Sequence, residues 1–525
     1  MSNDAAVSSA VRAKADFPDW LSPMLVKELR QGMRSRQFLI CFLALQAAMI
    51  FPAIIGLMTA SISGSTQGVT VFFWIIVGVP LLLIMPFSGL GAISREKTGN
   101  TLELIFLTRL TARRIVFGKW VAIIAQTLLL VSAILPYAVL RYYLGGVNIT
   151  GELTGLGLLL AASALLTSFT VGISPVMGRV GRVLMPIGLV FGLQIVSVIS
   201  VIPGGSVLRA SGVDWKFVTV MALEGIYMML LMLETGAGKI GPAAENHSTP
   251  KRLVALASVL TALLYSYVQG TMGVIWLPAL LVAGPVLVGA VCEPIRLVPS
   301  VYRSFLRLGF AGRALGWLLY PGWPSGVFFS LLVLGIAGFR IDALAGVSHM
   351  VAAHSVPLGA HVRPLITRYV PTTRDMMIPR IVEVAILGAF FTPPAFFRLL
   401  KLRISVPVVF YFLLQAALAL LSVVGVMATD LRPKIPVQTG PSGVEEVLAC
   451  IPTCTLVQLS RIRDWDLGLQ RLVLEGLVVV TVCLLGILLV RMFPEWRTIS
   501  ALLRTAASLP PEKLPPDAAR PAEAA

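Results

Sequence analysis

Long apolar runs separated by short polar segments dominate this chain. Twelve of the runs have the length and apolarity to cross about 30 Å of hydrocarbon as helices. Their approximate limits are 37–62, 70–93, 118–144, 153–177, 182–203, 216–236, 253–272, 274–292, 316–339, 381–399, 404–428 and 471–492. The pattern predicts an all-α polytopic membrane protein with about twelve transmembrane helices.

A different pattern precedes the first run. Ser22 and Pro23 form a helix start, because serine caps a helix and proline suits its first turn. The residues that follow place an apolar face against a basic one: Met24, Leu25, Leu29 and Met33 against Lys27 and Arg30. We therefore expect residues 1–36 to form a cytoplasmic lead-in and an amphipathic helix that contacts lipid at the membrane interface, although an ordinary basic juxtamembrane segment has the same composition.

The remaining segments suggest the domain limits. Residues 37–236 hold six runs, and residues 237–492 hold about six more with two long outer loops, 340–380 and 429–470. Residues 493–525 are rich in proline and alanine towards their end, and we expect them to be a disordered cytoplasmic tail.

Composition and charge agree with a membrane protein. Of 525 residues, 57% are hydrophobic and only 13% are charged, whereas a soluble domain has roughly 25% charged residues. The net charge of +17 has a membrane explanation, because lysine and arginine collect in cytoplasmic connections. No nucleic-acid-binding module interrupts the apolar runs. The same rule favours both termini in the cytoplasm, as for a multi-pass protein of a bacterial inner membrane.

The connection between the second and third runs, Ser94–Trp120, is the most informative stretch. It carries six basic residues and two acidic ones around an apolar helix-like run, Leu102–Leu107. From composition alone, this 94–120 segment is either an ordinary positively charged connector or a docking element for a cytoplasmic partner.

Two stretches give the N-terminal half a resemblance to a known family. The first is the basic amphipathic segment before the first run, and the second is a pattern within 94–120. The residues of that pattern are Glu96, Thr101, Leu102, Glu103, Thr108, Arg109, Leu110, Gly118 and Lys119. The half resembles the membrane-domain (permease) subunit of an ATP-binding-cassette transporter of type 2. Arg109 is a departure, since the family usually has proline there.

The resemblance implies a fold, partners and a role. The basic helix would be the family's interfacial elbow helix. The 94–120 segment, with Phe106 in its apolar run, would be a coupling element that docks in a groove of a separate cytoplasmic ATPase subunit. ATP and Mg²⁺ would bind that subunit and no cofactor would bind this chain, which would work in an exporter as a homodimer or with a second permease. Beyond residue 236 no family motif is present, so that region is either a diverged second half or an appended membrane domain.

Enzymatic chemistry is not expected on this chain. The nearest imitation of a phosphate-binding loop, Gly236–Lys239, lacks the upstream glycine and the Ser/Thr after the lysine. Glu224 lies within the sixth run, where a charge is costly. It is either a functional group paired with a residue such as Arg141, or a buried structural glutamate.

Two outer loops hold residues that could bind metal or form a disulfide. His349, His354 and His361 crowd the first loop, but few other ligands lie nearby, so we expect a solvated loop and no metal. Cys450 and Cys454 share the second loop, where the spacing allows a disulfide and equally allows two free thiols.

Two other functions fit the pattern. Twelve runs in two halves and the glutamate in the sixth run suit a secondary transporter driven by an ion gradient. A non-transporting membrane scaffold that recruits a partner through the 94–120 segment is the other alternative.

Overall fold

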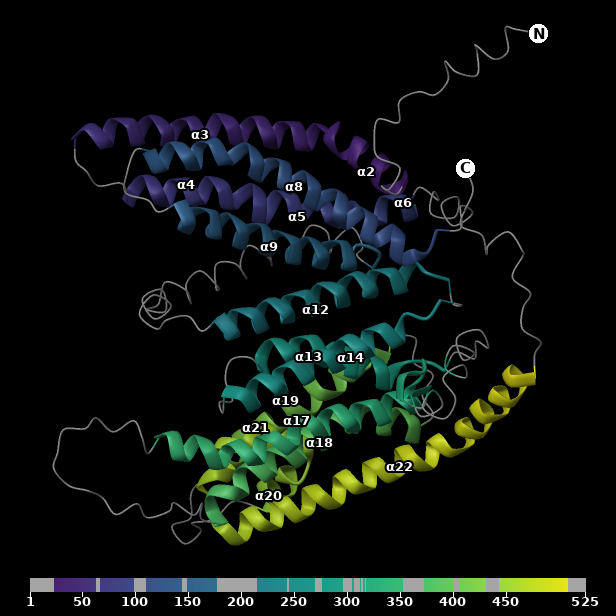
Figure 1. Ribbon diagram of the computed structural model, residues 1–525. Coiled ribbons are helices and arrows are strands. Elements are labelled where there is room, and N and C mark those ends of the chain that lie inside the picture. The colour runs from purple at the N-terminus through teal and green to yellow at the C-terminus, as the bar shows by residue number, and fades with distance from the viewer. Residues whose placement is uncertain are drawn as a thin grey trace, which may run out of the picture. The chain divides into compact units, whose positions relative to one another are not determined.

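The computed structural model describes most of the chain. The described residues are 23–62, 67–98, 110–143, 149–176, 215–242, 245–269, 276–295, 318–352, 373–400, 407–430 and 443–508, with 305, 312, 315 and 316. Their regular structure is helical, without strands, which confirms the all-α prediction. Two compact units divide the chain: unit 1, Met1–His247, and unit 2, Ser248–Ala525 (Figure 1). The sequence had placed this boundary at residue 236.

Membrane-spanning helices are abundant in both units. Among the described residues, nine helices are long and apolar enough to cross a membrane, and two more, Pro278–Cys292 and Trp323–Ala337, are apolar but shorter. Together they cover eleven of the twelve predicted runs. The remaining run, 182–203, lies outside the described residues.

Unit 1 contains eight described α-helices, the first of which is the predicted basic helix. Its helices are α2 (Pro23–Met33), α3 (Arg36–Ile62), α4 (Gln67–Val79), α5 (Met85–Ser88), α6 (Ser94–Thr98), α8 (Ala112–Tyr143), α9 (Ile149–Ile173) and α12 (Trp215–Ile240). Ser35 separates α2 from α3, because its Oγ accepts a hydrogen bond from the N–H of Phe38 at 3.2 Å and so caps α3. Helix α2 contacts α8, with Leu25 and Leu29 half-buried and Met33 exposed.

The second span of unit 1 is interrupted twice. A π-helical turn (η1, Pro80–Ile84) separates α4 from α5, and a 3₁₀ turn (η2, Gly89–Gly91) precedes α6. Pro80 and Pro86 supply no N–H, so the regular ladder of hydrogen bonds loses a donor at each. Ser174, directly after α9, bonds the backbone around the 3₁₀ turn: its Oγ donates to the carbonyl of Leu90 at 2.8 Å and accepts from the N–H of Ile93 at 3.2 Å.

Small residues let two helices of unit 1 approach closely. A Cβ built on Gly172 of α9 would lie 2.3 Å from the carbonyl oxygen of Met232 on α12. A Cβ on Gly236 of α12 would lie 2.9 Å from the Cα of Gly172. Backbone therefore meets backbone at this crossing, which is the packing that small residues permit in membranes.

Unit 2 contains eight described helices. They are α13 (Ser248–Gln269), α14 (Trp276–Cys292), α17 (Trp323–Ala352), α18 (Thr373–Leu399), α19 (Pro407–Asp430), α20 (Gly443–Ala449), α21 (Pro452–Asp464) and α22 (Leu467–Ser508). Helix α18 packs extensively against α22, and α14 packs against α13 and α17. Phe391 and Trp323 are buried in one core cluster of this unit.

Three segments that the sequence placed in loops or in the tail are partly helical. In 340–380, α17 continues to Ala352 and α18 begins at Thr373, so the connection is shorter than predicted. The 429–470 segment holds α20 and α21, whose Leu448 and Ile462 are buried although the segment as a whole is polar. The tail is helical as far as Ser508, because α22 continues past its internal proline into a run rich in alanine and leucine.

Candidate functional site

A buried lysine links three helices of unit 1. Lys119, in the third turn of α8, is 4% exposed. Its Nζ lies 2.7 Å from Oε1 of Glu96 on α6 and 3.1 Å from Oε1 of Glu28 on α2. The ammonium group thus donates to two carboxylates, and the three side chains form what we call the Lys119 site.

Local structure explains why these groups meet. Helix α2 has one acid, Glu28, which lies three residues after Leu25 and so shares its inward face. The 3₁₀ turn before α6 places Glu96 at the end of the second span. Helix α8 contacts α2, and the side-chain amide of Gln126 on α8 lies against Gly32 of α2, where glycine leaves room for it.

The Lys119 site combines residues from both stretches that carry the family resemblance, the basic helix and the 94–120 segment. Glu96, Gly118 and Lys119 are described residues, and Gly118 is half-buried beside the lysine. Thr101, Leu102, Glu103, Phe106, Thr108 and Arg109 lie outside the described residues. Sequence analysis missed Glu28, although a single acid within a basic helix was a usable signal.

A second polar cluster lies where the connection enters α8. Arg113, in the first turn of α8, donates to Glu234 of α12 at 3.0 Å and to the carbonyl of Asn246 at 2.7 Å. His247 places Nδ1 2.8 Å from the same glutamate and Nε2 3.1 Å from Glu245. The C-terminal part of the 94–120 segment is therefore bonded to α12 as well.

The intramembrane charges pair differently from the prediction. Arg141 donates to Glu152 of α9 at 3.0 Å and to Thr70 Oγ1 at 2.8 Å, and its guanidinium lies 4.2 Å from the ring of Phe73. Glu152 follows Arg141 by only eleven residues, so the partner comes from the next helix along the chain. Glu224 is buried on α12, and the arginine that the sequence suggested as an example of its partner is bonded to Glu152 and Thr70.

The two cysteines of the second predicted loop are free thiols. Cys454 is buried on α21 and its Sγ donates to the carbonyl of Leu418, while Cys450 Sγ lies beside Gly476 of α22. Because the thiols point to different helices, the structure has no disulfide between them. Burial raises the pKa of both thiols, and nearby Glu446 raises the pKa of Cys450 further.

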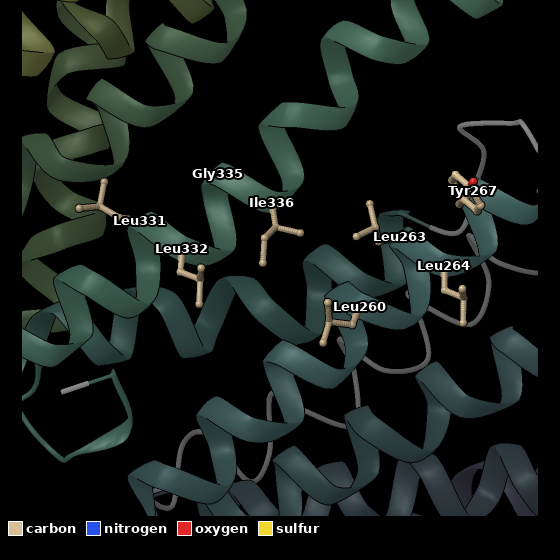
Figure 2. Close-up of a pocket in the computed structure, with 8 residues that line it drawn as sticks. All are labelled: Leu260, Leu263, Leu264, Tyr267, Leu331, Leu332, Gly335 and Ile336. Carbon is tan, nitrogen blue, oxygen red and sulfur yellow. The ribbon is translucent and has the colours of Figure 1, made fainter. Parts of the chain in front are cut away.

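Helices of unit 2 enclose an open apolar cavity of about 860 Å³ (Figure 2). Helices α13 and α17 line it, and its walls are aliphatic apart from Gly335 and the aromatic ring of Tyr267. The lining residues are Leu260, Leu263, Leu264, Tyr267, Leu331, Leu332, Gly335 and Ile336. Such walls suit hydrocarbon and lack the charged groups that a polar ligand needs.

Neither a metal site nor a known relative indicates the function of the chain. Within the described residues no group of three His, Cys, Asp or Glu side chains could hold a metal ion, and His349 lies on α17. His354 and His361 lie outside those residues. No protein-family model, curated sequence or solved structure matches the chain.

Proposed function

We propose that this chain is the membrane-spanning permease subunit of an ATP-binding-cassette exporter, coupled through the 94–120 segment to a separate ATPase subunit. The Lys119 site is the observation that carries the proposal. It joins the basic helix α2 to both ends of the 94–120 segment, which are the two stretches on which the family resemblance rests. An unrelated connector needs no such junction.

A docking element must transmit displacement to the spans. Glu96 lies near the start of the 94–120 segment and Lys119 lies near its end. The 2.7 Å contact between them closes the base of the connection between the second and third spans. Glu28 extends the junction to α2, and Arg113 extends it to α12. A partner that displaces the closed segment therefore moves the ends of α2, α6, α8 and α12 together, whereas an open connection would absorb the displacement.

The rest of the proposal follows from the same assignment. The docking end and both termini lie in the cytoplasm, the helices cross a bacterial inner membrane, and ATP with Mg²⁺ binds the partner subunit. The apolar helices support the membrane location. This chain contributes the pathway and the coupling element, and catalysis belongs to the ATPase.

The test is a pull-down of the tagged chain from its native membrane in mild detergent, followed by mass spectrometry. We expect an ATPase subunit to co-purify, and to be lost with Glu103→Lys and with Phe106→Ala. Matched controls are Glu475→Lys, at an exposed glutamate of α22, and Phe51→Ala, at an exposed phenylalanine of α3. Both controls should retain the ATPase.

The result that refutes the proposal is a chain that emerges without any nucleotide-binding partner, or an ATPase that survives both docking changes. Transport by the purified chain alone would then favour the gradient-driven alternative. A retained partner whose ATP hydrolysis never responds to transported compounds would favour the scaffold.

A further inference from the structure

The helices of the two units can be matched in chain order. In unit 1 the first to fourth helices are α3, the interrupted α4–α6, α8 and α9, and the sixth is α12. The predicted run 182–203, between α9 and α12 in the sequence, lies outside the described residues and has no helix to match. In unit 2 the first to sixth helices are α13, α14, α17, α18, α19 and α22, with α20 and α21 inserted before the last.

Matched helices have the same neighbours. In unit 1 the first helix packs on the second and third, the second on the third and fourth, the third on the fourth and sixth, and the fourth on the sixth. The same seven pairs of matched, described helices are in contact in unit 2, although the second helix touches the fourth, and the third touches the sixth, only over a small area. The three remaining pairs (first with fourth, first with sixth, second with sixth) make no main contact in either unit.

Helix directions also agree. In unit 2, Gly388 of α18 faces Thr481 of α22, and Arg491 of α22 donates to the carbonyl of Leu399 at 3.4 Å, so the fourth and sixth helices run parallel. In unit 1 the contact between Gly172 and Gly236 brings together the C-terminal ends of the fourth and sixth helices. Two parallel helices require one crossing between them, which is consistent with a fifth span in each unit.

A buried cation closes the same connection in unit 2. Glu293 directly follows the second helix, as Glu96 ends the second span of unit 1. Arg252, 1% exposed, donates through Nη2 to Oε2 of Glu293 at 3.0 Å. It also donates to the carbonyls of Tyr320, at 2.9 Å, and Gly322, at 3.0 Å, just before the third helix.

The two junctions connect the same helices of each unit through different residues. In unit 1 the cation comes from the third helix, and in unit 2 it comes from the first helix. Each ties the end of the second helix to the start of the third. In unit 2 the hydroxyl of Ser248 donates to the same carboxylate, which fixes Glu293 further.

We propose that unit 2 is a diverged repeat of unit 1, and that its junction of Arg252 and Glu293 is the base of a second docking point for an ATPase subunit. One chain then binds two ATPase subunits and needs no second permease chain. This inference rests on the proposed function, because the partner is the one assigned to unit 1. It favours the diverged second half over the appended domain that the sequence left open.

The experiment counts ATPase subunits by native mass spectrometry of the full chain purified with its ATPase in mild detergent. Wild type should carry two per chain. Glu96→Gln and Glu293→Gln should each shift the complex to one, and the double variant should shift it to none. Glu475→Gln, at an exposed glutamate, should retain two.

A second measurement leaves both junctions intact. A photo-crosslinking amino acid replaces Arg95 in unit 1 or Pro294 in unit 2, both of which are exposed beside a junction glutamate. Irradiation of native membranes should join one ATPase to the chain at each position, and two when both positions carry the crosslinker.

The outcomes separate the two proposals. A wild-type chain without any ATPase overturns the proposed function. A single ATPase that crosslinks at residue 95 and never at 294 leaves the proposed function standing and overturns the repeat-based docking point. A complex of two chains with two ATPase subunits overturns it as well, because each chain would then use one docking point.

Discussion

Replacing Lys119 with methionine gives the sharpest test of the junction in unit 1. The side chain of Lys119 is 5% exposed, and those of Glu28 and Glu96 are 15% and 17% exposed. Lys119→Met keeps most of the apolar stem and removes the ammonium group, which leaves two poorly hydrated carboxylates facing each other. Removing one partner of a buried ion pair costs about 3–5 kcal/mol.

The hydrogen bonds give a similar magnitude. The ammonium group makes two charge-assisted bonds, and each is worth about 1.5–3 kcal/mol. Because the carboxylates retain some contact with solvent, we expect a loss of about 3 kcal/mol in the free energy of unfolding. The triple variant Lys119→Met, Glu28→Gln, Glu96→Gln carries no unbalanced charge and should recover most of that loss.

The assay is equilibrium unfolding in mixed micelles, with sodium dodecyl sulfate as denaturant and tryptophan fluorescence as readout. The control is Lys27→Met, which removes an exposed ammonium group from α2 outside the spans and should cost no more than about 0.5 kcal/mol. The reasoning is refuted when Lys119→Met costs no more than the control, or when the triple variant is no more stable than the single one.

Three further predictions address packing and thiol chemistry. Gly172→Ala should lower stability by about 1–3 kcal/mol in the same assay, because backbone blocks the new methyl group, whereas Gly157→Ala in the same helix meets open space and should raise stability by up to about 1 kcal/mol. Ser174→Ala should cost about 1–3 kcal/mol there, since three buried backbone groups lose a bond to the hydroxyl. Because their pKa values are raised, Cys450 and Cys454 should react slowly with maleimide at neutral pH and faster, up to about tenfold per pH unit, as pH rises, and a non-reducing gel should show no internal crosslink.

Hydropathy sufficed for the spans because a span is a bulk property of some twenty residues. The same averaging failed for α20 and α21, whose buried contacts are interspersed with polar groups that bond inside the unit. Gln458 of α21 donates to Ser422 of α19 at 3.0 Å, for example, so a polar residue here is a packing residue. The mean hydropathy of a window reflects the polarity of Gln458 but not the hydrogen bond that satisfies it.

Ion pairs were the least predictable part of the site. The motif indicated Glu96 and Lys119 without indicating that they touch. Glu28 joined them because α2 lies against α8, and that neighbour relation is not written in the local sequence. The sequence also did not indicate that Arg141 bonds Glu152. Helix α8 contacts both α9 and α12, and Glu152 is the partner because it lies near the start of α9, level with the end of α8 that carries Arg141.

The two junctions suggest why the halves share a layout without sharing a motif. What each unit needs is a closed connection between its second and third helices, and any buried cation within reach of the carboxylate meets that need. Lys119 reaches Glu96 from the third helix, and Arg252 reaches Glu293 from the first. A requirement that several positions can satisfy constrains contacts more than residue types, so the neighbour relations of the helices persist while the sequences drift apart.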